Sequence, residues 1–121
     1  MALNLYVSKG GNVAVVHCRG RIVFGEEADH LRCVVLNLLK ETPRIVMNLA
    51  WVDHIDGCGL GTLVASFISA RNREAEIKLA GLSPTARRVL MATNVDRLFK
   101  VYDSTEGAIE SFRPYPEAAA D

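Results

Sequence analysis

The sequence predicts a single α/β domain built on a mixed, mostly parallel sheet of about five strands with about four helices. Apolar runs of strand length alternate with amphipathic segments of helix length, an order typical of crossover units in a parallel sheet. The first two predicted strands are separated only by a turn, so they form a hairpin and make the sheet mixed. The length of 121 residues fits one domain with one core.

The first half of the chain supplies three of these strands and one helix. Apolar residues alternate with polar ones over 3–7, and a β-branched run follows a glycine-rich turn, so 3–7 and 13–19 predict a hairpin that ends at Gly20. Helical spacing predicts a helix over 26–40, and its apolar stripe consists of Ala28, Leu31, Val35, Leu38 and Leu39. The short apolar run at 45–49 predicts a buried strand.

The next elements follow a glycine-rich segment at 57–61. A helix is expected from there to about Arg73, with an apolar face formed by Leu60, Leu63, Val64, Phe67 and Ile68. Residues 77–80 predict another strand. Ser83 and Pro84 make a favourable N-cap and first-turn pair, so they predict the start of a third helix.

The C-terminal part completes the alternation of strands and helices. Residues 101–102 predict a brief strand, and Asp103 with Glu106 resembles a capping box that starts a last helix. Prolines and a short alanine run follow this helix. The sequence therefore predicts a domain over 1–113 and a flexible C-terminal tail over 114–121.

Composition argues against several classes of function. The 14 Lys and Arg residues balance the 14 Asp and Glu residues, so the chain lacks the positive charge that nucleic-acid binding requires. Its longest uncharged stretch, from Gly57 to Ala70, is shorter than the ~20 apolar residues of a membrane span. Three scattered cysteines without a CxxC pair fit a reducing cytoplasm, and the spacing of the three histidines supports neither a metal site nor a cofactor.

The glycine-rich segment is a weak match to nucleotide-binding motifs. A dinucleotide fingerprint would use Gly57 and Gly59, but its third position is Thr62 and no acidic residue ends a following strand. A phosphate-binding loop of the Walker type is absent, because no Gly-Lys-Ser/Thr follows the glycines. Both nucleotide interpretations are therefore disfavoured.

A catalytic cysteine is the second interpretation, and close packing is the third. Cys58 would lie at a helix N-terminus, where the helix dipole favours a thiolate, and His54 is close in sequence. The nearby Asp56 disfavours a thiolate, and nothing in the sequence directs His54 toward Cys58. The glycines could instead let the helix approach the sheet closely.

A docking surface is the fourth interpretation. Opposite the apolar face, the predicted helix carries a row of small, uncharged residues beside Gly61, namely Cys58, Thr62, Ala65, Ser66 and Ser69. A solvent-facing helix surface normally carries Lys and Glu, whereas the core of a protein interface is depleted of charge. The row therefore favours partner binding, unless another part of the chain covers it.

Three stretches of the sequence, 49–61, 82–90 and 95–104, together resemble a known family. They resemble the STAS domain, the fold of bacterial anti-sigma factor antagonists, whose signature reads Asp-Ser-Ser-Gly-Leu-Gly after a strand. The resemblance extends over about 3–112. It implies a cytoplasmic, non-enzymatic module that docks on an anti-sigma factor, often a serine kinase, and a homodimer is compatible with it.

The resemblance also assigns a binding site and a phosphorylation switch. Its partner-binding residues would be Asp56, Gly57, Cys58, Gly59, Gly61, Thr62, Ala65, Ser66 and Ser69. Cys58 occupies the position of the serine that the family phosphorylates, so we expect no phosphorylation there. Two alternatives stay open: a scaffold subunit of a stressosome-like or lipid-transport complex, and, third, a thiol-dependent enzyme that uses Cys58.

Overall fold

An antiparallel hairpin begins the sheet. The computed structural model describes residues 3–113, and its first strands are β1 (Leu3–Gly10) and β2 (Val13–Ile22). They pair from Leu3 opposite Gly20 to Gly10 opposite Val13. The hairpin pairing ends at Gly20 as predicted, but β2 itself continues to Ile22 and is longer than the predicted strand at 13–19. Gly20 has a φ of 113° and adjoins a shift in the β2–β3 register, so it forms a bulge within the strand.

The other strands run parallel to β2. They are β3 (Arg44–Ile55), β4 (Glu76–Ala80) and β5 (Val101–Tyr102), in the spatial order β1-β2-β3-β4-β5. The predicted fold class, a mixed and mostly parallel sheet, is confirmed. β3 is longer than the predicted strand at 45–49, because it continues along β2 after β4 has ended.

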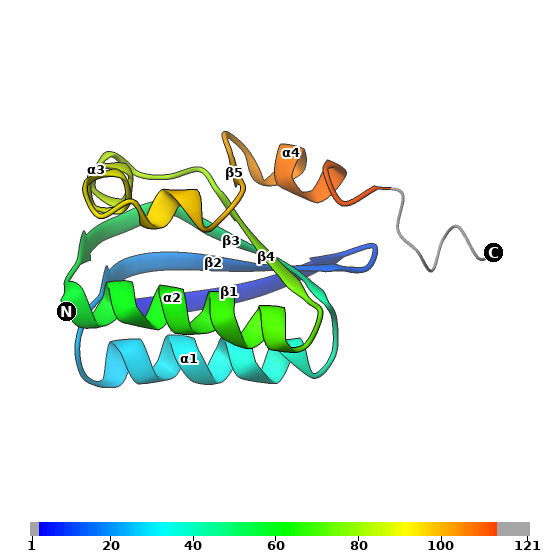
Figure 1. The fold of residues 1–121 in the computed structure, drawn as a ribbon, viewed down its shortest axis with the longest axis horizontal. Coiled ribbons are helices and arrows are strands. Elements are labelled where there is room, and N and C mark those ends of the chain that lie inside the picture. The colour runs from blue at the N-terminus through cyan, green and yellow to red at the C-terminus, as the bar shows by residue number, and fades with distance from the viewer. Residues whose placement is uncertain (1–2, 114–121) are drawn as a thin grey trace.

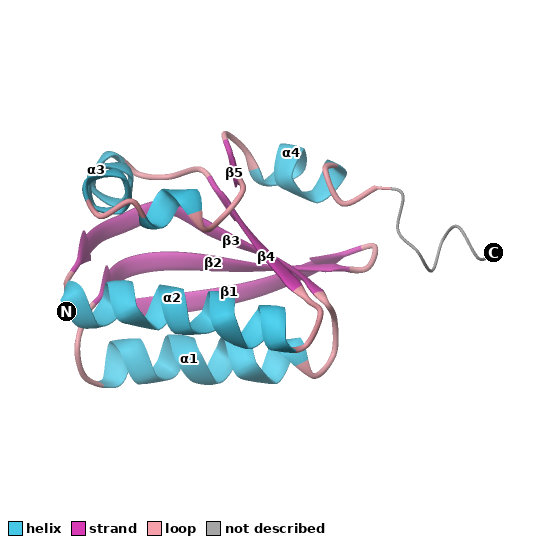
Figure 2. Ribbon diagram, viewed as in Figure 1, coloured by secondary structure: helices cyan, strands magenta, loops and turns pink. Residues whose placement is uncertain are grey.

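The helices cover the two faces of the sheet unequally. Figure 1 shows α1 (Glu26–Leu39) and α2 (Gly57–Asn72) side by side on one face, while the short α4 (Thr105–Glu110) lies on the opposite side. α3 (Pro84–Ala92) packs against β3 and is followed by a 3₁₀ turn at Val95–Arg97 (Figure 2). Ser83 is the N-cap of α3 as predicted: its hydroxyl accepts a hydrogen bond from Ala86 N at 3.0 Å.

The core has two parts that share the sheet. The larger part lies under α1 and α2 and contains four residues of the predicted stripe of α1, Leu31, Val35, Leu38 and Leu39. All five residues of the stripe, including Ala28, are buried. The smaller part lies under α4 and contains Val13, Val15, Val46, Ala80 and Ala108. Beside it the buried Lys78 donates a 2.6 Å hydrogen bond to Ser111 and lies 3.9 Å from the ring centre of Phe112. α4 is thus held by apolar packing and by one sequestered cation.

The start of α4 differs from its prediction. Ser104, not Asp103, is the N-cap, and its hydroxyl accepts a hydrogen bond from Gly107 N at 3.0 Å. The helix begins one residue later than a cap at Asp103 would require, because a hydroxyl at 104 is the group placed to reach that amide. The predicted tail over 114–121 lies outside the described residues.

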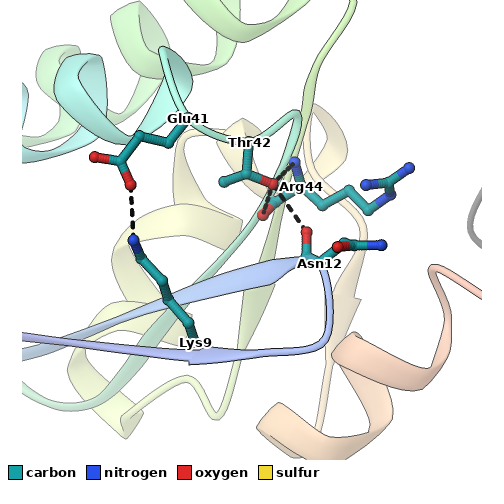
Figure 3. Close-up of polar contacts among 5 residues, drawn as sticks. All are labelled: Lys9, Asn12, Glu41, Thr42 and Arg44. Carbon is teal, nitrogen blue, oxygen red and sulfur yellow. Dashed lines mark hydrogen bonds and ion pairs between the residues drawn. The ribbon is translucent and has the colours of Figure 1, made fainter. Parts of the chain in front are cut away.

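A polar cluster ties the end of α1 to the hairpin turn (Figure 3). The Thr42 hydroxyl donates to the Asn12 carbonyl at 2.9 Å and accepts from Arg44 N at 3.2 Å. An exposed ion pair of 2.7 Å joins Lys9 to Glu41. These contacts fix the place where β3 enters the sheet beside β2, and they leave the opposite end of β3 for the candidate site.

Candidate functional site

The site begins at Asp56, the single residue between β3 and α2. Its carboxylate accepts hydrogen bonds from Gly59 N at 2.8 Å and from Phe24 N at 3.0 Å. The first bond caps α2, and the second reaches the loop between β2 and α1. The Asp56 side chain therefore ties the start of α2 to the loop between β2 and α1, where Phe24 lies 32 positions earlier in the sequence.

These backbone donors also fix the charge of Asp56. The amide of Phe24, then that of Gly59, hold the pKa of the Asp56 carboxyl below its usual value of 3.8, with smaller contributions from the Cys58 amide and the nearby His54. Donors that bond to the charged form stabilise it. Asp56 is therefore a fixed negative charge at the start of α2.

The glycines of the segment serve different purposes. A Cβ on Gly59 would lie 1.8 Å from the carbonyl oxygen of Ile22, so only glycine fits where α2 crosses the end of β2. A Cβ added to Gly57 or to Gly61 would meet no atom within 4 Å, and both glycines are exposed. The packing interpretation therefore holds for Gly59, whereas Gly57 and Gly61 lie on an open surface. All three belong to α2 itself and not to a loop before it.

This close approach sets the rotation of α2 about its axis. The buried residues of the helix are Gly59, Leu63, Ser66 and Ala70. The predicted apolar face is wrong for Ile68, whose side chain is 51% exposed. The predicted docking row is wrong for Ser66, which is buried and donates its hydroxyl to the Thr62 carbonyl at 2.9 Å. The side of α2 that carries Gly59 faces the sheet, because the missing side chain lets the helix approach the Ile22 carbonyl.

The two flanks of α2 have different neighbours. Phe67 meets Phe99 edge to face with ring centres 5.3 Å apart, so this flank faces the segment after α3. The other flank carries Thr62 and Ser69, both half-buried, and faces α1, which packs beside α2. Gly57, Cys58, Gly61 and Ile68 are exposed on the first three turns of α2, and together with Ala65 we call them the α2 outer face. Ala65 is its one half-buried member.

A family comparison agrees with this geometry. The chain matches the model of the STAS domain over residues 4–108. It belongs to the STAS domain family. The resemblance seen in the sequence is thereby confirmed.

Relatives of this STAS domain share most of its length. A STAS-domain containing protein of Pseudomonas aeruginosa is 30% identical over 101 residues, which are 84% of this chain and 99% of that protein. A Thermotoga maritima protein proposed to be an anti-sigma factor antagonist has a crystal structure with a TM-score of 0.82 at 26% identity, covering 90% of this chain and 94% of that one. The unphosphorylated anti-sigma factor antagonist SpoIIAA has the same fold, with a TM-score of 0.72 at 17% identity over 92% of this chain and 99% of its own.

Within this STAS domain, Cys58 is a surface residue. Its side chain is exposed, and no hydrogen bond joins its sulfur to another residue of 3–113. Nor does a hydrogen bond connect it to His54, which lies on the exposed end of β3. A thiol nucleophile requires a base within hydrogen-bond reach. The described residues position no such base.

Residues 3–113 contain neither a candidate metal site nor a membrane-spanning helix. No three His, Cys, Asp or Glu side chains in that range are grouped so that they could hold a metal ion. No helix there has the length and hydropathy needed to cross a bilayer.

Phe24 is a site residue that the sequence interpretation missed. Its ring is 76% exposed, and its amide is tied to Asp56 at the start of the α2 outer face. An aromatic residue between Val23 and Gly25, directly after a strand, is a signal that could have pointed to it. The contact to Asp56 is a tertiary one and has no counterpart in local spacing.

Proposed function

We propose that this STAS domain is an anti-sigma factor antagonist that docks on a serine-kinase-like anti-sigma factor through the α2 outer face and Phe24. The observation that carries the proposal is an uncharged surface next to an exposed aromatic ring. Phe24 is 76% and Ile68 is 51% exposed, and the other members of the α2 outer face are glycines and small side chains. Interface cores are depleted of charge and enriched in aromatic residues. The family of the chain, whose relatives include anti-sigma factor antagonists, supports the choice of partner.

Asp56 supports this surface from behind. It holds the Phe24 loop against the start of α2, so both halves of the docking surface are fixed before a partner arrives. A preorganised surface loses little conformational entropy on binding. We further propose that the domain acts in the cytoplasm by binding and carries out no catalysis.

The proposed antagonist works without the serine switch of the family. Cys58 stands where the phosphorylated serine would be, and a thiol does not form the usual stable phosphoester. The neighbouring hydroxyls are engaged: Thr62 donates to the Cys58 carbonyl at 3.1 Å, and Ser66 is buried. Incubation with the partner kinase and ATP, followed by mass spectrometry, should find no phosphate on α2. A Cys58→Ser variant should gain it, and phosphate on Cys58 itself would contradict the proposal.

A scaffold subunit of another signalling or transport complex is the second candidate. Cys58 at the position of the phosphorylated serine favours the scaffold, because a domain without the phosphorylation switch suits constitutive assembly. The Pseudomonas relative, which matches most of the chain, is named only as a STAS-domain containing protein. Both candidates use the α2 outer face, so the identity of the bound partner distinguishes them.

Titration calorimetry tests the antagonist. The purified chain is titrated with each serine-kinase anti-sigma factor of the source bacterium, and one should bind with saturation. Cys58→Glu should weaken that binding at least about 100-fold, because it places an unpaired charge in the interface. Cys33→Glu, at the exposed cysteine of α1, is the matched control and should bind like the unmodified chain. Absence of binding to every such factor would overturn the antagonist and leave the scaffold.

A further inference from the structure

The sheet has a face that no helix fully covers. α4 covers the part around Val46 and Ala80 (Figure 1). Elsewhere on this face Tyr6 and Trp51 are 67% and 66% exposed. Neighbouring strands place Arg19 opposite Trp51, and Asn4 opposite Arg19. The result is an open surface made of aromatic and polar side chains on three adjacent strands.

A hollow of about 640 Å³ lies beside this surface. Its walls come from the ends of β1, β2 and β3 and from the first turn of α3. The side chains that matter here are Asn4, Arg19, Arg21, Trp51, Asp53 and Thr85. Gly20, the bulge in β2, lies between the two arginines and also lines the hollow. The hollow is therefore a product of the bulge and of the extension of β3 beyond β4.

The arginines of the hollow lack acceptors. The Nε of Arg21 is buried and has no hydrogen-bond partner among the described residues. No ion pair joins Arg19 or Arg21 to another residue of 3–113, although Asp53 lines the same hollow. A buried donor without an acceptor is costly, so such groups are normally satisfied. This nitrogen is covered by protein atoms, so a ligand in the hollow would meet the terminal nitrogens of the half-buried Arg21, which form no hydrogen bond with another residue of 3–113.

We propose that this hollow binds an acidic side chain of a partner protein, with Trp51 and Tyr6 packing against the residues around it. Two arginines against one aspartate leave the hollow with an excess positive charge, and a guanidinium pairs with a carboxylate through two parallel hydrogen bonds. A small free anion could pair with the arginines but would leave both exposed rings uncovered. Tryptophan, tyrosine and arginine are the residues enriched where binding energy concentrates in interfaces.

The proposed site is separate from the α2 outer face. Its lining comes from β1, β2, β3 and the start of α3, and it includes no residue of α2. The two surfaces could therefore bind two partners at once. The inference does not depend on the proposed antagonist function, since no residue of the α2 outer face lines the hollow.

Tryptophan fluorescence tests the site directly, because Trp51 is the chain's one tryptophan. The full chain is titrated with a capped peptide of alternating glutamate and leucine, and separately with its glutamine counterpart. We expect a saturable change with the glutamate peptide, at least about tenfold weaker binding in Arg19→Gln and in Arg21→Gln, and little response to the glutamine peptide. Arg32→Gln, on the exposed side of α1, is the matched control and should bind like the unmodified chain.

Any one of four results would overturn the proposal. Three of them are a lack of saturable change at millimolar glutamate peptide, equal binding of the glutamine peptide, and unchanged binding in Arg19→Gln. Inorganic phosphate that binds as tightly as the glutamate peptide would also overturn it, because the site would then be one for small anions. Arg19 is exposed, so its variant keeps the test valid even where Arg21→Gln lowers the melting temperature.

Discussion

Gly59 is the residue on which the position of α2 depends. Its Cα lies so near the Ile22 carbonyl that an added Cβ would be 1.8 Å from the oxygen. The same oxygen accepts a hydrogen bond from Asp56 N at 3.4 Å, so it has little freedom to move. A single missing methyl group thus decides which side of α2 faces the sheet and which side is left for a partner.

Gly59→Ala should therefore destabilise the fold. Overpacking of a tight contact typically costs about 1–3 kcal/mol, and we expect at least the upper part of that range because the obstacle is backbone. Urea unfolding measures the change. Gly61→Ala is the matched control: its Cβ meets nothing within 4 Å, so alanine should be neutral or stabilise by about 0.5–1 kcal/mol. Equal stability of the two variants would contradict the proposed role of Gly59.

Asp56 should make stability depend on pH in the acid range. The pKa of its carboxyl is lowered in the folded state, chiefly by the Phe24 and Gly59 amides, from a usual value of 3.8. Its contribution is therefore fully present above that value and is lost as pH falls through the lower, folded pKa. Asp56→Asn keeps a helix cap but does not titrate. The stability difference between the two proteins should be constant near neutral pH and shrink below pH of about 4.

Acid-dependent urea titrations of both proteins measure this difference. A difference that grows as the pH falls would contradict the assignment of Asp56 as a group stabilised by backbone donors. A difference that stays constant down to the acid transition would contradict it as well. The same titration tests whether Asp56 fixes the Phe24 loop to α2, because its carboxylate accepts the hydrogen bonds of both the Phe24 and the Gly59 amides.

At the level of elements, α2 presents adjacent positions with opposite tolerance to charge. Ala65 is half-buried on the outer face, whereas the next residue, Ser66, is 3% exposed. Ala65→Glu should change the free energy of unfolding by no more than about 0.5 kcal/mol, as for other surface sites. Ser66→Glu should cost several kcal/mol, because it places an unpaired charge in the core. Thermal melts compare them, and a similar loss in both would show that the outer face is packed.

α4 illustrates a different way of attaching an element. It has six residues, too few for a stable isolated helix, so its stability depends on the surface below. That surface combines Val46 and Ala80 with the buried Lys78, whose ammonium contacts Ser111 and the ring of Phe112. By covering the β4 end of the sheet, α4 leaves the β1–β3 end open, and the arginine hollow is found there.

For the molecule as a whole, local sequence patterns predict the order of elements but not how they are rotated and extended. The predicted apolar stripe of α1 is confirmed, because the helical spacing of its apolar residues is enough to define its buried face. The face of α2 is wrong at Ile68 and Ser66, because a distant carbonyl sets it through Gly59. The length of β3 was underestimated, since its second half alternates irregularly and is supported by β2.

The candidate site was predictable to a similar extent. Asp56, Cys58 and Gly61 are found in sequence because they lie on one short segment at the end of a strand. Phe24 was missed, because it joins the site through one long-range hydrogen bond. The hollow was not predictable, because its walls come from four elements and its central feature is an unsatisfied donor.

Cooperative unfolding of the whole domain is the last prediction. The two parts of the core share the strands: along β3, Ile45 and Met47 point into one part and Val46 into the other. Neither part can lose its strands without exposing the other, so we expect one transition with a urea m-value of about 1–3 kcal/mol/M. Trp51 fluorescence reports the β3 end of the sheet, and far-ultraviolet circular dichroism reports mainly the helices. Their midpoints should coincide, and an earlier transition in either signal would show that one layer unfolds separately.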